Sequence, residues 1–297
     1  MKYAWIDAQR REFPLPYVWE VLAVSISGYR AWRRGGKPDR TRLSDPQAVA
    51  LMKSIHAEVK AAYVSRRMHR ELQDRGHRIG LSRVERLMRE PCIRARHKWR
   101  FKAPTDFKHS LPVALNVLAR NFTPDAPNRV WTGDITYIQT SEGWLYLAIV
   151  LDLFNREIVG WSIKPRMTAD IVTDALTMAW FRRKPGPGVM FHSDRGSQYA
   201  SQAMSARLAE YGMTASMSRK GHCWDNAPSE SFFNSLQNER VHGTSCATRA
   251  EAEADLFQYI EVFYNRSRRH STLGYSAPTR FLQDGIGKHV DQPSKAA

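Results

Sequence analysis

The sequence predicts an α/β protein with a mixed five-stranded sheet flanked by helices, preceded by an all-α region. Two patterns support this prediction. Within residues 45–91, apolar residues recur at steps of three and four, which is the spacing of one helix face. From residue 129 onward, segments rich in β-branched and aromatic residues alternate with turns and with longer helical patterns. The change of period near residue 129 indicates two different structural regions.

Charge is distributed unevenly between these regions. The chain of 297 residues has a formal net charge of +16. Residues 1–120 hold 26 Lys and Arg against 11 Asp and Glu, which gives +15, whereas the remaining residues hold 19 against 18. Basic side chains concentrated in this way are typical of proteins that bind the phosphate backbone of nucleic acids. A merely basic surface is the alternative, and charge alone does not separate DNA from RNA.

Several classes of protein are disfavoured by the composition. No run of 18 apolar residues is present, and the most apolar segment, 144–154, has the length of a buried strand. The first residues lack the apolar core of a secretory signal. The three cysteines, Cys92, Cys223 and Cys246, form no C-x-x-C pair, which argues against a disulfide framework and a cysteine-rich zinc site. We therefore expect a cytoplasmic, nucleoid-associated protein without a membrane partner.

The first part of the chain, residues 1–44, is expected to form an N-terminal helical segment. Its clearest pattern runs from Val18 to Trp32 and predicts a short helix or a helix-turn element. The following GGKPDR is a flexible break, because Gly and Pro interrupt regular structure.

Residues 45–102 predict a helix-turn-helix region that binds DNA. A first amphipathic helix spans 45–64 and a second runs from about 65 to 73. The third is expected to begin at Ser82 as its cap, because a Glu follows three residues later, and to end at a proline. Two short helices joined by a Gly-containing turn, the second of them basic, are typical of this motif.

The third helix is predicted to present an arginine face to DNA. Val84, Leu87 and Met88 share one side and can pack on the preceding helix. The opposite side carries the candidate DNA contacts Arg83, Arg86 and Arg89. The alternative is a small helical bundle whose arginines are only solvated.

A basic and aromatic stretch follows at residues 93–102. Lys98 and Arg100 alternate with Trp99 and Phe101, a pattern that suits backbone contacts combined with base stacking, so both basic residues are candidate DNA contacts. The alternative is a linker whose aromatic rings dock on a neighbouring domain. Residues 103–128, which contain four prolines, are expected to form an extended linker.

The α/β region is predicted over residues 129–245. Three strands joined by short turns come first, followed by helices that alternate with two shorter strands. The expected strands are 129–139, 144–153, 157–163, 189–193 and 214–217, and the expected helices are 168–183, 201–211 and 226–241. The order β-β-β-α-β-α-β-α predicts a mixed sheet of the ribonuclease H kind. A C-terminal helical extension at 246–285 and a loose tail at 286–297 complete the chain.

Three carboxylates stand at informative places in this layout. Asp134 lies in the middle of the first strand, and Asp194 lies just past the carboxyl end of the fourth, where ligands of α/β sheets bind. Glu230 lies in the first turn of a helix whose dipole favours a negative charge. Each would be a poorly compensated charge alone, but together they could be satisfied by divalent cations.

These residue types fit phosphoryl transfer assisted by metal ions. Mg²⁺ and Mn²⁺ take oxygen ligands and keep positions open for water and phosphate. Two such ions can activate the attacking oxygen and stabilise the leaving oxygen of an in-line displacement. The sequence therefore predicts that Asp134, Asp194 and Glu230 are both metal ligands and catalytic residues, with two bound ions.

Specific motifs surround these carboxylates. The stretches WTGDITY (131–137), HSDRGSQY (192–199) and DNAPSESFFNSL (225–236), with YNRSRRHSTLGYSAP (264–278), resemble those of bacterial insertion-sequence transposases. The resemblance is to the group whose catalytic subunit, with an integrase-like core, is encoded by the second of two reading frames. The 35 residues between Asp194 and Glu230 match the spacing that gives this group its D,D,35E name. The resemblance covers about residues 45–285.

The resemblance implies an activity and a set of partners. Transposases of this group nick the ends of their element, and the freed 3′-OH then attacks another DNA strand. It also implies a homo-oligomer on DNA and a partnership or fusion with the first-frame product. By the same resemblance, Asn234 and Gln237 on the helix of Glu230 are candidate DNA contacts. Gln237 stands where the family usually has Lys or Arg, and His222 stands where Asn or Asp is usual.

Other functions were weighed against this one. A hydrolytic nuclease with the same fold would share the carboxylates but not need the basic helical region. A non-enzymatic DNA-binding protein, either a repressor or an inactive remnant, would not depend on the three acids at all. A retroviral integrase is disfavoured because no His-His-Cys-Cys zinc cluster precedes the core.

Overall fold

The computed structural model describes residues 2–10, 12–34, 43–96, 110–220, 222–242 and 246–290. It divides into two compact units. The first unit comprises residues 1–54 and 68–93, and the second comprises residues 55–67 and 94–297. The short segment 55–67 therefore belongs to the larger unit, although its sequence pattern continues that of the helical region.

The N-terminal helices are short and share a small core. They are α1 (Lys2–Gln9), α2 (Leu15–Val21) and α3 (Ile26–Arg33). Ile6, Val18 and Tyr29 form the buried cluster between them. The helix-turn element expected between Val18 and Trp32 is confirmed by α2 and α3, and α1 was not predicted.

The three helices predicted after residue 44 are present as α4 (Asp45–Glu58), α5 (Ser65–Asp74) and α6 (Leu81–Arg89). Helix α4 ends earlier than expected because Lys60 and Ala61 adopt left-handed backbone conformations, with φ of 49° and 62°. The prediction that Ser82 caps the third helix was wrong. Helix α6 begins one residue before it, and Gly80 occupies the cap position without a side-chain hydrogen bond.

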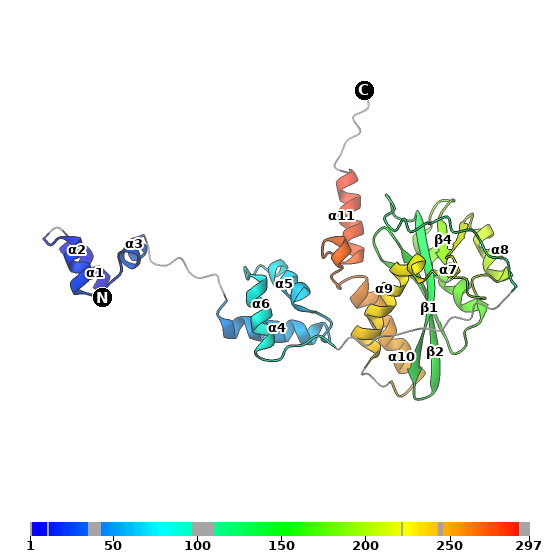
Figure 1. Cartoon of the computed structure of the whole chain (residues 1–297), viewed down its shortest axis with the longest axis horizontal. Coiled ribbons are helices and arrows are strands. Elements are labelled where there is room, and N and C mark those ends of the chain that lie inside the picture. The colour runs from blue at the N-terminus through cyan, green and yellow to red at the C-terminus, as the bar shows by residue number, and fades with distance from the viewer. Residues whose placement is uncertain are drawn as a thin grey trace, which may run out of the picture. The chain divides into compact units, whose positions relative to one another are not determined.

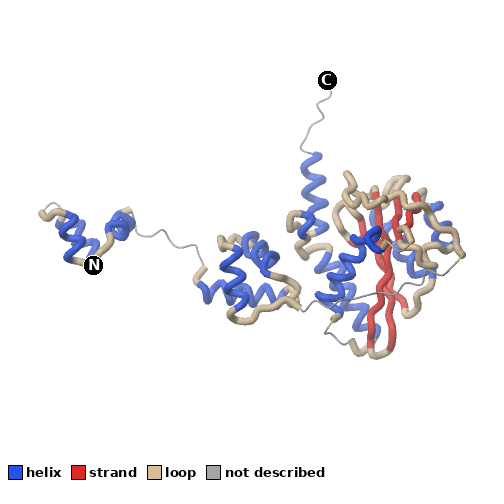
Figure 2. Tube along the Cα trace, in the orientation of Figure 1, coloured by secondary structure: helices blue, strands red, loops and turns tan. Residues whose placement is uncertain are grey.

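The predicted mixed sheet of five strands is confirmed (Figure 2). The strands are β1 (Val130–Thr140), β2 (Gly143–Asp152), β3 (Ile158–Lys164), β4 (Met190–Ser193) and β5 (Thr214–Met217). Their order across the sheet is β3-β2-β1-β4-β5. The β1–β2 and β2–β3 pairs are antiparallel, whereas β1–β4 and β4–β5 are parallel.

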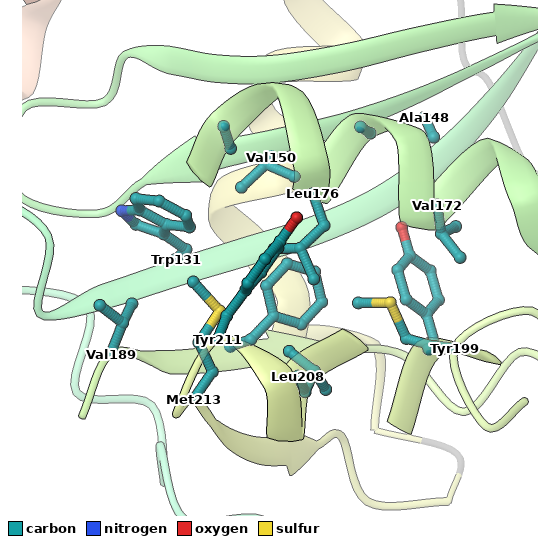
Figure 3. Packing of buried hydrophobic residues seen from close by; sticks show 14 of the residues in the cluster. Trp131, Ala148, Val150, Val172, Leu176, Val189, Tyr199, Leu208, Tyr211 and Met213 are labelled. Carbon is teal, nitrogen blue, oxygen red and sulfur yellow. The ribbon is translucent and has the colours of Figure 1, made fainter. Parts of the chain in front are cut away.

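Helices cover both faces of this sheet (Figure 1). On one face lie α7 (Ala169–Arg183) and α8 (Gln202–Glu210), and on the other lie α9 (Ala227–Leu236) and α10 (Arg249–Phe257). Figure 3 shows the core beneath α7 and α8, where Trp131, Leu176 and Tyr211 pack together. Because both faces are covered, β2 is apolar almost throughout and buried over its second half.

A glycine sets the distance between α7 and β3. A Cβ at Gly160 would lie 2.2 Å from the carbonyl oxygen of Ala175 and 2.7 Å from Cβ of Ala179. No side chain fits in that space, so helix α7 lies directly on the strand. Gly160 therefore fixes how closely this layer packs.

The C-terminal part differs in detail from the expectation. Helices α9 and α10 each continue into a π-helical turn, Gln237–Val241 and Gln258–Tyr264. Short 3₁₀ turns lie at Cys223–Asn226 and Ser271–Leu273, and a further helix, α11, spans Pro278–Val290. Helix α11 begins inside the expected helical extension at 246–285, and it extends past residue 285, where a loose tail was expected. Within the described residues, no helix is long and apolar enough to cross a membrane.

The sequence predicts that Trp131 and Trp144 are core residues, but the two behave differently. Trp131 is fully buried, as predicted. Trp144 is 46% exposed, which the prediction of a core residue did not anticipate. It lies at the start of β2, where the strand is not covered, and its ring packs edge-to-face on Tyr137 at 5.0 Å between centroids.

Candidate active site

Asp134 is a half-buried acid on the central strand β1. Side chains alternate along a strand, so Thr132, Asp134 and Thr136 point to the same face. Helix α9 covers this face, because Ser229 of α9 donates a hydrogen bond to the Thr132 hydroxyl at 2.9 Å. The Asp134 carboxylate accepts one backbone hydrogen bond, from the amide of Ile135 at 2.8 Å.

Asp194 follows directly after β4. In the parallel pairing of β1 with β4, Thr132 is the partner of His192. Continuing that register by two residues brings Asp194 beside Asp134. The Asp194 carboxylate accepts a hydrogen bond from the amide of Gly196 at 2.9 Å, which closes a tight turn after the strand.

Glu230 lies in the first turn of α9, as the sequence predicts. Pro228 occupies one of the first two helical positions, where its missing N–H costs nothing. The sequence predicts Asn226 as the cap of this helix, and Asn226 does stand at the cap position, but its side chain makes no capping hydrogen bond. Glu230 itself is exposed, and partial burial of its carboxyl raises its pKa.

Burial and the charges of the other two acids act together on the Asp134 carboxyl. Burial raises the pKa of the Asp134 carboxyl well above its usual range, and the charge of Asp194 raises this pKa further. The Ile135 amide opposes these effects, and the charge of Glu230 adds a smaller increase. A buried carboxyl surrounded by two other acids is a place where a cation would relieve repulsion.

Tyr199 is a neighbour of the acids that the sequence analysis did not single out. Burial, followed by the charges of Asp134 and Asp194, raises the pKa of its hydroxyl well above the usual range. That hydroxyl is buried and makes no hydrogen bond to any of the residues that the structure describes. Tyr199 packs on Phe191 in the core beneath α7 and α8 (Figure 3). Its place in the HSDRGSQY motif was the available signal.

Asp134, Asp194 and Glu230 offer only carboxylate oxygens, which are ligands that Mg²⁺ and Mn²⁺ prefer. Among the described residues, no basic side chain acts on the pKa of Asp134. Within the described residues, however, no three His, Cys, Asp or Glu side chains are already arranged to hold one ion. Glu230 is the exposed member of the three and Asp134 and Asp194 are half-buried. Closure around a cation therefore requires movement of side chains, with Glu230 the least constrained.

Polar contacts hold α9 against β1. Ser229 hydrogen-bonds to Thr132. In addition, the side-chain amide of Gln237 donates to the Thr136 hydroxyl at 3.4 Å and to the carbonyl of Tyr137 at 3.3 Å. These contacts lie on both sides of Asp134 along the strand. They fix the rotation of the helix that carries Glu230.

The structure separates the two predicted DNA contacts on this helix. Gln237 is 2% exposed, and its amide is used by β1. Gln237 is therefore not available to a DNA phosphate in this structure. The resemblance implied a surface cation at this position, whereas Gln237 lies in the interior. Asn234 is exposed and hydrogen-bonds to Asn238 on the next turn at 2.8 Å.

The arginine face of α6 is less free than predicted. Arg83 and Arg86 both pair with Asp45 of α4, at 2.5 Å and 2.6 Å. Arg86 also pairs with Glu90 at 2.8 Å. Arg89 is exposed at the end of the helix. Lys98 and Arg100 lie outside the described residues.

A second acid close to the site has a structural role. Glu239, on the π-helical turn after α9, accepts hydrogen bonds from Arg268 at 2.6 Å, from Arg67 at 3.1 Å and from the Tyr259 hydroxyl at 2.9 Å. Arg268 is 2% exposed. From the sequence, the basic cluster RSRRH at 266–270 could be either a DNA contact or solvated charge, but its Arg268 is an internal partner of Glu239.

His192, two residues before Asp194, is fully buried. Its ring is hydrogen-bonded to the hydroxyl of Ser216 at 2.9 Å. Burial lowers its pKa to about 4, so it is neutral at physiological pH. It therefore packs beneath the site.

Comparisons with known families and proteins place the chain among the proteins of insertion elements. Residues 44–101 match the family described as HTH-like domain, and residues 124–223 and 211–278 match two families described as Integrase core domain. The chain is 42% identical over 264 residues to the uncharacterized 31 kDa protein of insertion element IS600 from Shigella sonnei, covering 89% of this chain and 97% of the relative. It is 40% identical over 286 residues to the transposase InsF of insertion sequence IS3A from Escherichia coli (strain K12), covering 95% and 98%.

Solved structures with a similar fold include two viral integrase cores. The catalytic core domain of BIV integrase matches 55% of this chain and 99% of its own, with a TM-score of 0.39 and 14% identity. The core domain of HTLV-2 integrase, solved in complex with magnesium, matches 53% and 98%, with a TM-score of 0.38 and 15% identity.

Proposed function

The chain belongs to the DDE transposases of IS3-type insertion elements, and from that premise we propose that it cuts DNA at the ends of its element and joins the freed 3′-OH ends to a second DNA site. Transposition and DNA integration are the activities of this family, and DNA is its partner. The observation that carries the proposal is the placement of the three acids: β1 and β4, which carry or precede the two aspartates, pair side by side, and the Ser229–Thr132 hydrogen bond holds the helix of Glu230 on the face of β1 that carries Asp134.

Asp134, Asp194 and Glu230 would hold two divalent cations, Mg²⁺ or Mn²⁺. When bound, such ions polarise the phosphate and lower the pKa of the attacking hydroxyl or water. The residues of the chain supply the geometry. Asp134 is fixed by the sheet and Asp194 by the tight turn after β4, whereas Glu230 is placed by α9, which is held against β1. An exposed Glu beside two half-buried Asp would let DNA enter before the site closes.

DNA recognition is proposed to be divided between the two parts of the chain. The helical region at 45–102 would bind the element ends, and the integrase core at 129–245 would hold the cleaved strand. Arg89 is the exposed candidate on α6. Arg83 and Arg86 would contact DNA phosphates only after releasing their ion pairs with Asp45. Lys98, Arg100 and Asn234 remain candidates. We further propose that the protein acts as a homo-oligomer on DNA, either together with the first-frame product or fused to it. Residues 103–128 would act as the linker between the two DNA-binding parts.

A cleavage and joining assay tests this function. The protein, with and without the first-frame product, is incubated with a labelled duplex carrying the element end, a target duplex and Mg²⁺ or Mn²⁺. We expect a nicked product and then a joined product. Asp134→Asn, Asp194→Asn and Glu230→Gln should each lower cleavage by about 10³-fold, since several kcal/mol of charge stabilisation is lost. The matched control Asp284→Asn, an exposed acid on α11, should retain activity.

The products distinguish the alternatives. Hydrolysis without any joined product would restrict the chain to a nuclease. Full activity of the three triad variants would reject the assignment of these carboxylates. Titration of the divalent ion should give a Hill slope near two if both ions are needed for cleavage, and a slope of one would contradict the two-ion proposal.

A further inference from the structure

A buried carboxylate next to the candidate site binds two side chains from a distant segment and one from its own loop. Asp225, in the 3₁₀ turn before α9, has a side chain with no exposed surface. It accepts hydrogen bonds from Arg120 Nε at 2.7 Å and Asn116 Nδ2 at 2.8 Å. It also accepts hydrogen bonds from Arg219 Nε at 3.0 Å, Nη2 at 3.1 Å and the backbone amide at 3.1 Å.

The charges of this cluster do not balance. Two guanidinium groups share one carboxylate, which leaves a net charge of about +1 by simple counting of ionised groups. The acid itself is buried, but the side chains of Arg120 and Arg219 are 42% and 51% exposed. Among the described residues, Arg120 uses only Nε and Arg219 uses Nε and Nη2 for side-chain hydrogen bonds. Each guanidinium thus keeps N–H groups for another acceptor.

The cluster lies beside the catalytic carboxylates. The amide of Ser218 donates to the carbonyl of Ser193 at 2.9 Å, and Ser193 directly precedes Asp194. On the other side of the loop, Asn226 Nδ2 lies 3.5 Å from the carbonyl of Gly133, which directly precedes Asp134. The loop that contains Arg219 and Asp225 is therefore attached to β1 next to Asp134 and to the end of β4 just before Asp194.

We propose that Arg120 and Arg219, oriented by Asp225, bind a backbone phosphate of the DNA strand held at the three carboxylates. This inference rests on the proposed function and adds a binding site to it. Guanidinium groups match phosphate oxygens with pairs of hydrogen bonds. Holding both side chains in place before DNA arrives reduces the entropy lost on binding. A cation at this place also offsets the repulsion between a phosphate chain and the acids nearby.

The competing explanation is purely structural. Asn116 and Arg120 precede β1, so their contacts with Asp225 also tie the end of the linker to the turn before α9. In that case, loss of Arg120 would lower stability without changing how DNA affinity depends on salt. The two explanations are separated by measuring binding and stability on the same variants.

The experiment measures binding of a labelled duplex with the element end, in EDTA, over a series of salt concentrations. Each lost phosphate contact should reduce the slope of log affinity against log salt by about 1. We expect this change for Arg120→Gln and for Arg219→Gln, with affinity weakened roughly 5–10-fold at 0.1 M salt. The control Arg207→Gln removes a half-exposed arginine that pairs with Glu210 on α8, and its slope should equal that of the wild type.

Lysine variants and neutral phosphates keep the test decisive if a glutamine variant does not fold. Arg120→Lys and Arg219→Lys retain the charge and should retain the slope. A single methylphosphonate near the cleaved bond should weaken binding at one position for the wild type and for the lysine variants, and it should have no further effect on a glutamine variant that folds. Unchanged slopes in both glutamine variants, or no sensitive phosphate for the wild type, would overturn the inference.

Failure of the inference and failure of the proposed function give different results. If the wild type cleaves the element end but the slopes do not change, only the phosphate site is rejected. If the slopes change as expected but no cleavage occurs with Mg²⁺ or Mn²⁺, the phosphate site stands and the catalytic proposal fails.

Discussion

Asp134 combines two unfavourable conditions in the protein without metal, namely burial and the nearby charge of Asp194. Its pKa in the folded state is raised above the unfolded value of about 3.9. The ionised form is therefore disfavoured by folding, so stability is lost as the pH rises from the unfolded pKa through the folded pKa. Above that window, Asp134 lowers the free energy of unfolding.

We therefore predict that Asp134→Asn stabilises the protein in EDTA at neutral pH. Asparagine removes the charge and can still accept the hydrogen bond from Ile135. The midpoint of thermal unfolding should rise by about 2–4 °C for each kcal/mol of repulsion removed, and the difference should shrink at pH 4. Mg²⁺ or Mn²⁺ should stabilise the wild type more than the variant. An equal midpoint at neutral pH would mean that Asp134 is not under electrostatic strain.

Residues could be predicted from the sequence where the signal was local. The spacing of Asp194 and Glu230 and their places beside β4 and at the start of α9 were readable from the sequence alone. The surroundings of Asp225 were not, because Asn116 and Arg120 reach it from about a hundred residues earlier in the chain. The burial of Gln237 likewise could not be predicted, because it is set by contacts with β1, about a hundred residues earlier in the chain.

At the scale of elements, the packing of α7 on β3 depends on Gly160. We predict that Gly160→Ala destabilises the second unit by about 1–3 kcal/mol, since the added methyl group meets the Ala175 carbonyl and helix α7 must shift. Chemical unfolding measures the change. Gly186→Ala is the matched control, because a Cβ there meets nothing within 4 Å. Similar losses in both variants would contradict the close-packing argument.

Elements were predicted where hydrophobic periodicity was strong, and their ends were not. The five strands follow the expected order because alternation and turns define them. The ends of α4 and α6 depend on single backbone conformations, at Lys60 and Gly80, which a periodic pattern does not encode. The π-helical turns after α9 and α10 hold Glu239 and Tyr259 in contact, a tertiary requirement that local preferences do not reveal.

At the scale of the whole chain, the boundary between the units lies inside the helical region. Residues 55–67 belong to the second unit, and two of their side chains explain why. The Tyr63 hydroxyl donates to the carbonyl of Ser267 at 3.1 Å and accepts from the amide of Arg269 at 3.2 Å. Arg67 pairs with the buried Glu239 at 3.1 Å. Continuous helical periodicity concealed this division in the sequence.

Two truncations should therefore behave differently. A chain that begins at residue 55 keeps Tyr63 and Arg67, and we predict that the thermal midpoint of its second unit equals that of the full chain. A chain that begins at residue 68 leaves Glu239 with Arg268 but without Arg67, and it removes a buried tyrosine. Loss of these contacts should cost about 3–5 kcal/mol, because a core tyrosine and a partner of a buried charge are removed together. Calorimetry of both chains measures this difference. The variants Tyr63→Phe and Arg67→Met in the full chain separate the contributions of the two side chains. Equal thermal midpoints for the two truncated chains would show that residues 55–67 add nothing to the stability of the second unit.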